Sequence, residues 1–309
     1  MNKKKQFLWA VLGSMMLAGL TACSGDDDPT DVPDDGVKAR RMTITETDGA
    51  AARQVLTRAI LTEADGLSAS WTTGDGLTYC NLTHTNLSTE EVYSGPLTAT
   101  STGATSQFTG SVECRTGDYL AVVYPAATFV TNESYTISLA GQDGTLGTLA
   151  KKYHYVFGKA YVTSVTDNTA DATMEKMKSL LTVCKFSFVD KGTNATIPIK
   201  KLEISYGGMG SDADKYPQTA TVTIKDDKTI GIFEQADVHA TGMAGSSPLL
   251  LEGSGEAQAF YVALLPTSYN RTFNFTVTNS SGTYSGTAKA TLNEGEYVVA
   301  TGLKLTKNN

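Results

Sequence analysis

The stretch Thr272-Phe273-Asn274-Phe275-Thr276-Val277-Thr278, continued by Asn279-Ser280-Ser281-Gly282 and Thr283-Tyr284-Ser285, decides the fold. Apolar and polar side chains alternate with a period of two up to Thr278, which is the pattern of a half-buried β-strand. Asn, Ser and Gly then form a turn signal, because Gly and Asn accept positive φ at little cost. The stretch therefore predicts a β-hairpin.

The same period recurs along the chain. Leu202, Ile204 and Tyr206 alternate with polar residues, and so do Val222 and Ile224. The continuous apolar run Tyr119–Tyr124, closed by Pro125, is typical of a central sandwich strand. Helical spacing of apolar residues occurs only in Ala172–Leu181, where we expect a short connector. The predicted fold class is therefore all-β, built as sandwiches.

The N-terminus reads as an export signal. Lys3, Lys4 and Lys5 precede the uncharged run Phe7–Leu20, which is too short to span a bilayer comfortably. Leu20-Thr21-Ala22-Cys23 closes it in the order typical of a bacterial lipoprotein precursor. We expect signal cleavage between Ala22 and Cys23, and acylation of Cys23 (palmitate or a similar chain), which anchors the protein to a membrane face.

An acidic segment follows the lipid site. Residues 24–36 carry six Asp and two Pro and no basic residue, so they cannot bury enough apolar surface to order themselves. We expect a flexible spacer over residues 23–49. The acidic run also resembles the signal that sends lipoproteins of the Bacteroides group to the outer face of the outer membrane, which predicts a surface-exposed location.

Composition excludes several functions. The formal charge is −7, and loss of residues 1–22, which hold three Lys and no acid, brings it to −10. That charge argues against nucleic acid as a partner. The sequence lacks a Gly-x-Ser-x-Gly elbow, a phosphate loop and a His-Glu-x-x-His helix, and its three His are scattered. We therefore expect no enzyme activity, no cofactor and no metal site.

Three cysteines remain after Cys23, an odd number for an exported protein. Cys184 shares a strand face with Phe186 and Phe188, which predicts a buried, inert thiol. Cys80 and Cys114 either form a disulfide or stay reduced; the sequence leaves both open.

The chain divides at a polar break, Asp167-Asn168-Thr169-Ala170-Asp171, within Ser164–Lys178. The predicted organisation is a signal peptide over 1–22, the spacer over 23–49, an N-terminal β-sandwich over 50–175 and a C-terminal β-sandwich over 176–309.

Several motifs together resemble the fimbrillin family, the type V pilin lipoproteins of the Bacteroides group. They are Arg58-Ala59-Ile60-Leu61, Ser70-Trp71-Thr72-Thr73-Gly74-Asp75-Gly76-Leu77, Tyr119-Leu120-Ala121-Val122-Val123-Tyr124-Pro125, Met177-Lys178-Ser179-Leu180-Leu181, Phe260-Tyr261-Val262-Ala263-Leu264-Leu265-Pro266 and Leu292-Asn293-Glu294-Gly295-Glu296-Tyr297. The resemblance implies two tandem transthyretin-like β-sandwich domains. By themselves these motifs are structural: Trp71 reads as a core aromatic ahead of the tight turn Gly74-Asp75-Gly76.

The resemblance also implies a mechanism. An arginine-specific protease cuts the N-terminal extension, the first strand of the N-terminal sandwich leaves, and a strand of another fimbrial subunit takes its place. Candidate cut sites are Arg40, Arg41, Arg53 and Arg58, and the bond Arg58–Ala59 matches the family position best. The removable strand is then expected within residues 50–58. Tyr297–Leu305 either completes its own domain or is the strand passed on.

Two functions follow as hypotheses. The first is a structural subunit of a cell-surface fimbria, at the stalk or the tip. The alternative is a surface lipoprotein that binds a host protein or glycan, as an adhesin, without polymerising. Tyrosines that could stack on sugar rings in that case are Tyr153, Tyr155, Tyr216 and Tyr269.

Overall fold

The computed structural model describes residues 36–47, 60–63, 67–85, 92–210, 212–225, 230–233 and 247–308. These residues form strands almost throughout, so the predicted all-β class is confirmed. The helical elements are α1 (Leu146–Thr148) and the π-helical turn Leu149–Tyr153 that continues it. In this part of the chain, no helix reaches the length and apolarity needed to cross a bilayer.

Strands of the first half of the chain have the following bounds: β1 Lys38–Thr47, β2 Ile60–Glu63, β3 Leu67–Ser70, β4 Gly76–Thr85, β5 Val92–Ala99, β6 Gln107–Cys114, β7 Tyr119–Tyr124, β8 Phe129–Thr131, β9 Ser134–Ser138, β10 Val156–Val165, β11 Thr169–Glu175 and β12 Lys178–Ser179. Strands of the second half are β13 Thr182–Asp190, β14 Thr196–Ile197, β15 Ile199–Tyr206, β16 Thr219–Ile224, β17 Ile230–Phe233, β18 Leu249–Ala257, β19 Phe260–Leu264, β20 Arg271–Asn279, β21 Gly282–Ala290 and β22 Tyr297–Lys307.

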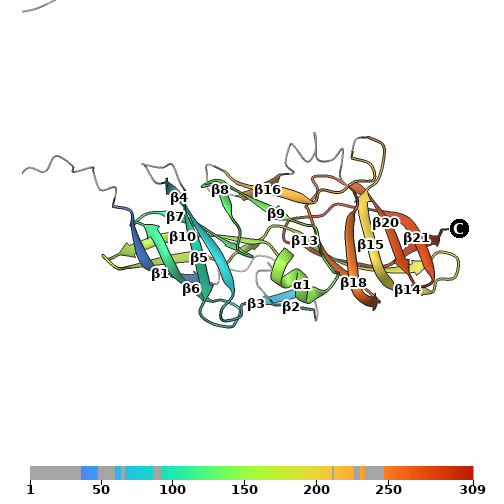
Figure 1. The fold of residues 1–309 in the computed structure, drawn as a ribbon, viewed down its shortest axis with the longest axis horizontal. Coiled ribbons are helices and arrows are strands. Elements are labelled where there is room, and N and C mark those ends of the chain that lie inside the picture. The colour runs from blue at the N-terminus through green and yellow to red at the C-terminus, as the bar shows by residue number, and fades with distance from the viewer. Residues whose placement is uncertain are drawn as a thin grey trace, which may run out of the picture. The chain divides into compact units, whose positions relative to one another are not determined.

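The first sheet closes on itself. Its strand order is β11-β1-β6-β5-β4-β7-β10-β12, and β10 also pairs with β11. This extra pairing joins β11, at one end of the path, to β10 near the other end, so that the sheet closes into a barrel. The two-residue strand β12 pairs with another part of β10. Figure 1 shows β1, in blue, beside β6 on one side of this barrel.

A tryptophan lies at the centre of the barrel. Trp71 is fully buried and makes edge-to-face contacts with Phe108 and Tyr124, with ring centroids 5.0 and 5.5 Å apart. Gly74 follows with φ of 95°, which is the tight turn predicted after the core aromatic. Residues of β1, β4, β5, β6, β7, β10 and β11 complete this interior cluster.

The second half repeats the order of strands. β13 pairs in parallel with the last strand, β22, just as β1 pairs in parallel with β11. The run β15-β20-β21-β22 corresponds to β4-β7-β10-β11. The two sheets differ at the closing pair: β10 and β11 pair over most of their length, whereas β21 and β22 pair only at Tyr284↔Lys307 and Ser285↔Thr306. The predicted tandem arrangement of two sandwich-like domains is therefore confirmed, one closed and one partly open.

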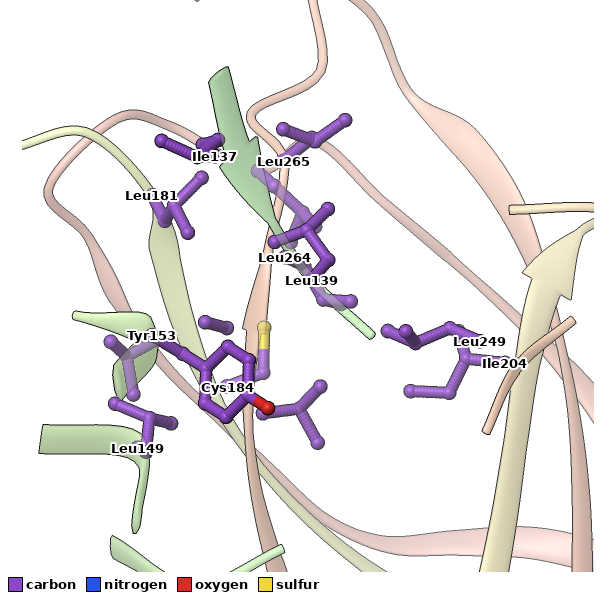
Figure 2. Packing of buried hydrophobic residues seen from close by; sticks show 14 of the residues in the cluster. Ile137, Leu139, Leu149, Tyr153, Leu181, Cys184, Ile204, Leu249, Leu264 and Leu265 are labelled. Carbon is purple, nitrogen blue, oxygen red and sulfur yellow. The ribbon is translucent and has the colours of Figure 1, made fainter. Parts of the chain in front are cut away.

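A third sheet uses strands of both halves, in the order β17-β16-β9-β8. Below it lies a core to which both halves contribute. Figure 2 shows Ile137 of β9 and Leu149 and Tyr153 of the π-helical turn in the same cluster as Cys184, Ile204 and Leu264. The expected boundary between residues 175 and 176 stays a prediction, and this shared sheet and core lie across it.

The expected connector at Ala172–Leu181 is wrong over most of its length. Residues 169–175 form β11, and Lys178–Ser179 form β12. Ala170, Ala172 and Met174 are buried alternately with exposed Asp171, Thr173 and Glu175. Because two of the three inward residues are Ala, the period of two is weak in the sequence and the Met and Leu residues suggested a helix instead.

Candidate functional site: the first strand and the groove that holds it

β1 is paired along its length on both sides. It runs parallel to β11 from Arg41↔Thr169 to Thr47↔Glu175, and antiparallel to β6 from Lys38↔Cys114 to Thr45↔Gln107. A strand in this position covers two neighbouring edges at once, so its removal would expose the main-chain groups of both β6 and β11.

The inward side chains of β1 belong to the barrel core. Met42 and Ile44 are fully buried, while Thr43 and Thr45, which alternate with them, are half-exposed on the outer face. Burial of one such apolar side chain stabilises a fold by about 1.5–3 kcal/mol. β1 thus contributes side chains to the barrel core as well as main-chain pairing to the sheet.

Two charged side chains hold the ends of β1. The Arg40 side chain is buried, and its guanidinium donates to the carbonyls of Thr166 (2.7 Å), Lys38 (3.2 Å) and Cys114. These bonds compensate the cost of taking the charge out of water. The strand is therefore fixed at its N-terminal end by a cation that the barrel's carbonyls solvate.

The other end is fixed by Glu46, which is also buried. Its carboxylate accepts from Trp71 Nε1 (2.9 Å) and from the backbone N–H of Met177 (3.3 Å). Departure of β1 would leave the indole N–H of Trp71 without this partner in an opened core. Since Trp9 lies in the expected signal peptide, Trp71 is the single tryptophan of residues 24–309 and reports on the occupancy of this groove.

The structure separates the predicted cut sites. Arg40 and Arg41 lie inside β1, and the N–H of Arg41 donates to the carbonyl of Asn168 at 2.9 Å, so a protease cannot bind this stretch as a free extended peptide while β1 is in place. Arg53 and the bond Arg58–Ala59 lie outside the described residues, as do Ala22 and Cys23. Both arginines follow β1 in the chain, so a cut at either would detach it.

Part of the spacer prediction is corrected. Residues 38–47, expected within the flexible segment 23–49, form β1. The sequence pattern did not predict this strand, because charged Arg40 and Glu46 occupy two of its inward positions and break the apolar alternation. The removable strand expected within residues 50–58 falls outside the described residues and stays a prediction; β1 is the first described strand of the first sheet.

The segment just after Arg58 is attached to the second half of the chain. Glu63 of β2 accepts from Lys185 Nζ (2.7 Å), from the Tyr297 hydroxyl (2.6 Å) and from the Tyr261 hydroxyl. The hydrogen bond from Lys185, followed by those from the two tyrosines, lowers the pKa of Glu63 to about 2. Leu61 is buried in the core to which both halves contribute. A cut at Arg58 would therefore leave β2 attached to the rest of the chain through Glu63 and Leu61.

β22 completes its own sheet. It pairs with β13 from Val183↔Tyr297 to Asp190↔Leu305, and Leu305 is buried. Of the two roles left open for Tyr297–Leu305, the structure thus places the segment in the second domain of its own chain.

The remaining predicted residues are mostly structural. Cys80, Cys114 and Cys184 are buried and free, so no Cys80–Cys114 disulfide is present. Among the sugar-stacking candidates, Tyr153 and Tyr216 are buried, and Tyr155 is half-buried; Tyr269 is 58% exposed. Among the described residues, no group of three His, Cys, Asp or Glu is placed to hold a metal ion.

No protein-family model matches the chain. No curated protein matches it either. Among solved structures, the chain is similar to a "putative cell adhesion protein" from Bacteroides ovatus, with 10% identity, 88% of this chain and 96% of the other covered, and a TM-score of 0.48.

A second protein with the same description, from Bacteroides eggerthii, matches with 13% identity, 86% coverage of both chains and a TM-score of 0.38. The shaft pilin SpaA from Lactobacillus rhamnosus GG matches with 11% identity, 88% and 99% coverage, and a TM-score of 0.33. Likenesses at this level assign no function to this chain.

Proposed function

We propose that the protein is a structural subunit of a cell-surface fimbria that assembles by strand exchange, and that β1 is the strand exchanged. The observation that carries the proposal is the position of β1: it is paired on both sides, contributes Met42 and Ile44 to the core, and precedes Arg58 in the chain. The resemblance of the sequence motifs to fimbrillins supports the same function.

The energetics favour replacement over a vacant groove. An empty groove would expose two sheet edges and the core positions of Met42 and Ile44 together, and a strand from another subunit would cover both again. Repetition of a head-to-tail contact of this kind would generate an open filament if the donor strand and the acceptor groove lie on different surfaces of the subunit.

Export precedes assembly in this proposal. The precursor is cleaved between Ala22 and Cys23, acylated on Cys23 and held at the outer face of the outer membrane. An arginine-specific protease then cuts the bond Arg58–Ala59, which separates the lipid anchor and β1 from the rest. Glu63 keeps β2 in place after the cut, because its partners Lys185, Tyr261 and Tyr297 all lie beyond the cut.

The test uses residues 24–309 treated with an arginine-specific protease. We expect a new N-terminus at Ala59, a red shift of Trp71 emission as β1 leaves, and SDS-resistant multimers with recovered emission. Arg58→Ala should abolish the new N-terminus at Ala59, and the double variant Arg53→Ala/Arg58→Ala should block all three changes, whereas Arg41→Ala, inside β1, should leave them intact. If the cut protein stays monomeric with unchanged Trp71 emission, β1 is not exchanged and the proposal fails.

The alternative function is an adhesin that keeps its anchor and binds a host protein or glycan without polymerising. The outward-facing tyrosines Tyr119 and Tyr161 favour it as a second candidate, because such rings are usually packed. The N-terminal residue of the protein recovered from cells separates the two: Ala59 indicates the processed subunit, and acylated Cys23 on every molecule indicates the adhesin.

A further inference from the structure

A hollow of about 450 Å³ lies on the surface of the first barrel, where β7, β10 and β11 run side by side. Its size falls within the range of sites that bind small ligands, roughly 300–1,000 Å³. Phe157, Gly158 and Met174 are buried residues that line it, and side chains of the outer face form its rim. It adjoins the groove of β1, because Thr173, Met174 and Glu175 of β11 line the hollow and also pair with β1, and Thr47 of β1 lines it as well.

Two tyrosines stand together at this hollow. Tyr119 of β7 is directly opposite Tyr161 of β10 in the sheet register, and their ring centroids are 5.2 Å apart. The two residues are 38% and 42% exposed. A cross-strand aromatic pair stabilises a sheet by itself; here the pair also borders a concave surface and leaves much of its ring area in contact with water.

The rim is locally positive in an acidic protein. Lys159, Lys176 and Lys178 line the hollow together with Glu175 and Glu294, whereas the chain as a whole carries −7. Lys159 Nζ lies 5.2 Å from the centroid of the Tyr119 ring, so one ammonium group is already placed beside the aromatic pair. A ligand with a negative charge would meet three cations and two anions here.

We propose that this hollow binds an acidic carbohydrate, such as a glycan that carries uronic acid, sialic acid or sulfate groups. The C–H face of a sugar ring can pack on an exposed tyrosine, while its hydroxyls need nearby polar donors and acceptors. The ammonium groups pair with the carboxylate or sulfate, an attraction that salt weakens because the site is open to solvent. The inference does not depend on strand exchange, since it rests on β7, β10 and β11.

β1 touches this site at one point. Thr47, the last residue of β1, lines the hollow, and its hydroxyl donates to the carbonyl of Met174 at 3.2 Å. Release of β1 would remove that wall. The precursor and the processed chain are therefore expected to differ in affinity for the same glycan.

The test is an array of acidic and neutral glycans probed with the uncut protein over residues 24–309, followed by titration with the best-bound acidic oligosaccharide and its neutral counterpart. We expect binding of acidic members only, weakened at least tenfold by Tyr161→Ala and by Lys176→Glu, and reduced by added salt. Tyr269→Ala removes an exposed tyrosine that does not line the hollow and should bind like the wild type.

Unchanged Trp71 emission and thermal unfolding in both variants would show that the barrel is intact. The proposal is overturned if no acidic glycan on the array is retained, if neutral and acidic members bind equally, or if Tyr161→Ala and Lys176→Glu bind like the wild type. A failure of polymerisation after cleavage would not contradict the glycan-binding proposal, so different results refute the two proposals.

Discussion

The replacement of Ile44 by Ala tests whether β1 is part of the core of the first barrel. Ile44 is fully buried between β6 and β11, and the change removes three carbon atoms. At ~0.8 kcal/mol per buried CH₂ the lost transfer free energy is roughly 2.4 kcal/mol, and the cavity adds to it, so the free energy of unfolding should fall by about 3 kcal/mol within the usual 2–5 kcal/mol.

The assay is urea unfolding of residues 24–309 followed by Trp71 emission, which reports on the barrel alone. With a slope of ~2 kcal/mol per M, the midpoint should fall by about 1.5 M. The matched control is Thr43→Ala, on the outer face of the same strand, where a change below about 1 kcal/mol is expected. After proteolytic cleavage, β1 carrying Ile44→Ala should dissociate up to roughly 100-fold faster. Equal midpoints for the two variants would refute the assignment of β1 to the core.

Three further predictions concern other parts of the molecule. Glu63→Gln should destabilise the chain at neutral pH more than Glu203→Gln, whose carboxylate forms a local pair with Lys201. Because the folded pKa of Glu63 is lowered from 4.5 to about 2, its contribution to the free energy of unfolding is complete above pH 4.5 and disappears as the pH falls through 2. In Glu63→Gln the free energy of unfolding should depend less on pH across this window. An unchanged pH dependence would contradict the lowered pKa of Glu63. Burial raises the pKa of Cys80 to about 12 and that of Cys114 to about 11, so Ellman's reagent at pH 8 should detect no thiol in folded residues 24–309 and three thiols when the same protein is unfolded in urea; rapid reaction of the native protein would be inconsistent with the structure. Gly144→Ala would place a Cβ 2.3 Å from the Phe260 ring at a φ of 77°, so it should lower the melting temperature by several degrees, while Gly147→Ala, which has open space around it, should leave melting unchanged or raise it; similar melting of the two variants would contradict this packing.

Much of the fold could be predicted where a strand alternates apolar and polar residues or is apolar throughout. The run Tyr119–Tyr124 is β7 to the residue, and the hairpin around Asn279-Ser280-Ser281-Gly282 joins β20 and β21 with Asn279 paired to Gly282. Cys184 is buried with Phe186 and Phe188, as their shared face predicts. In these segments local pattern and tertiary burial agree.

Sequence reasoning missed the strands in which the local pattern and the tertiary burial disagree. β1 places Arg40 and Glu46 inward, where carbonyls and N–H groups from distant segments satisfy them. No local pattern shows that Thr166 and Trp71 will be their partners. The same limit applies to the aromatic hollow, because the pairing of β7 with β10 that brings Tyr119 and Tyr161 together is a long-range contact.

The two consecutive arginines of β1 have one more consequence. While the strand is folded, the sheet protects Arg40 and Arg41 from cleavage. If β1 is released as proposed, the arginine-specific protease could cut the free peptide again there, and the remaining fragment would lack the buried guanidinium of Arg40. Rebinding would then be weakened permanently, which would make strand departure a one-way step and leave the vacancy to an incoming subunit.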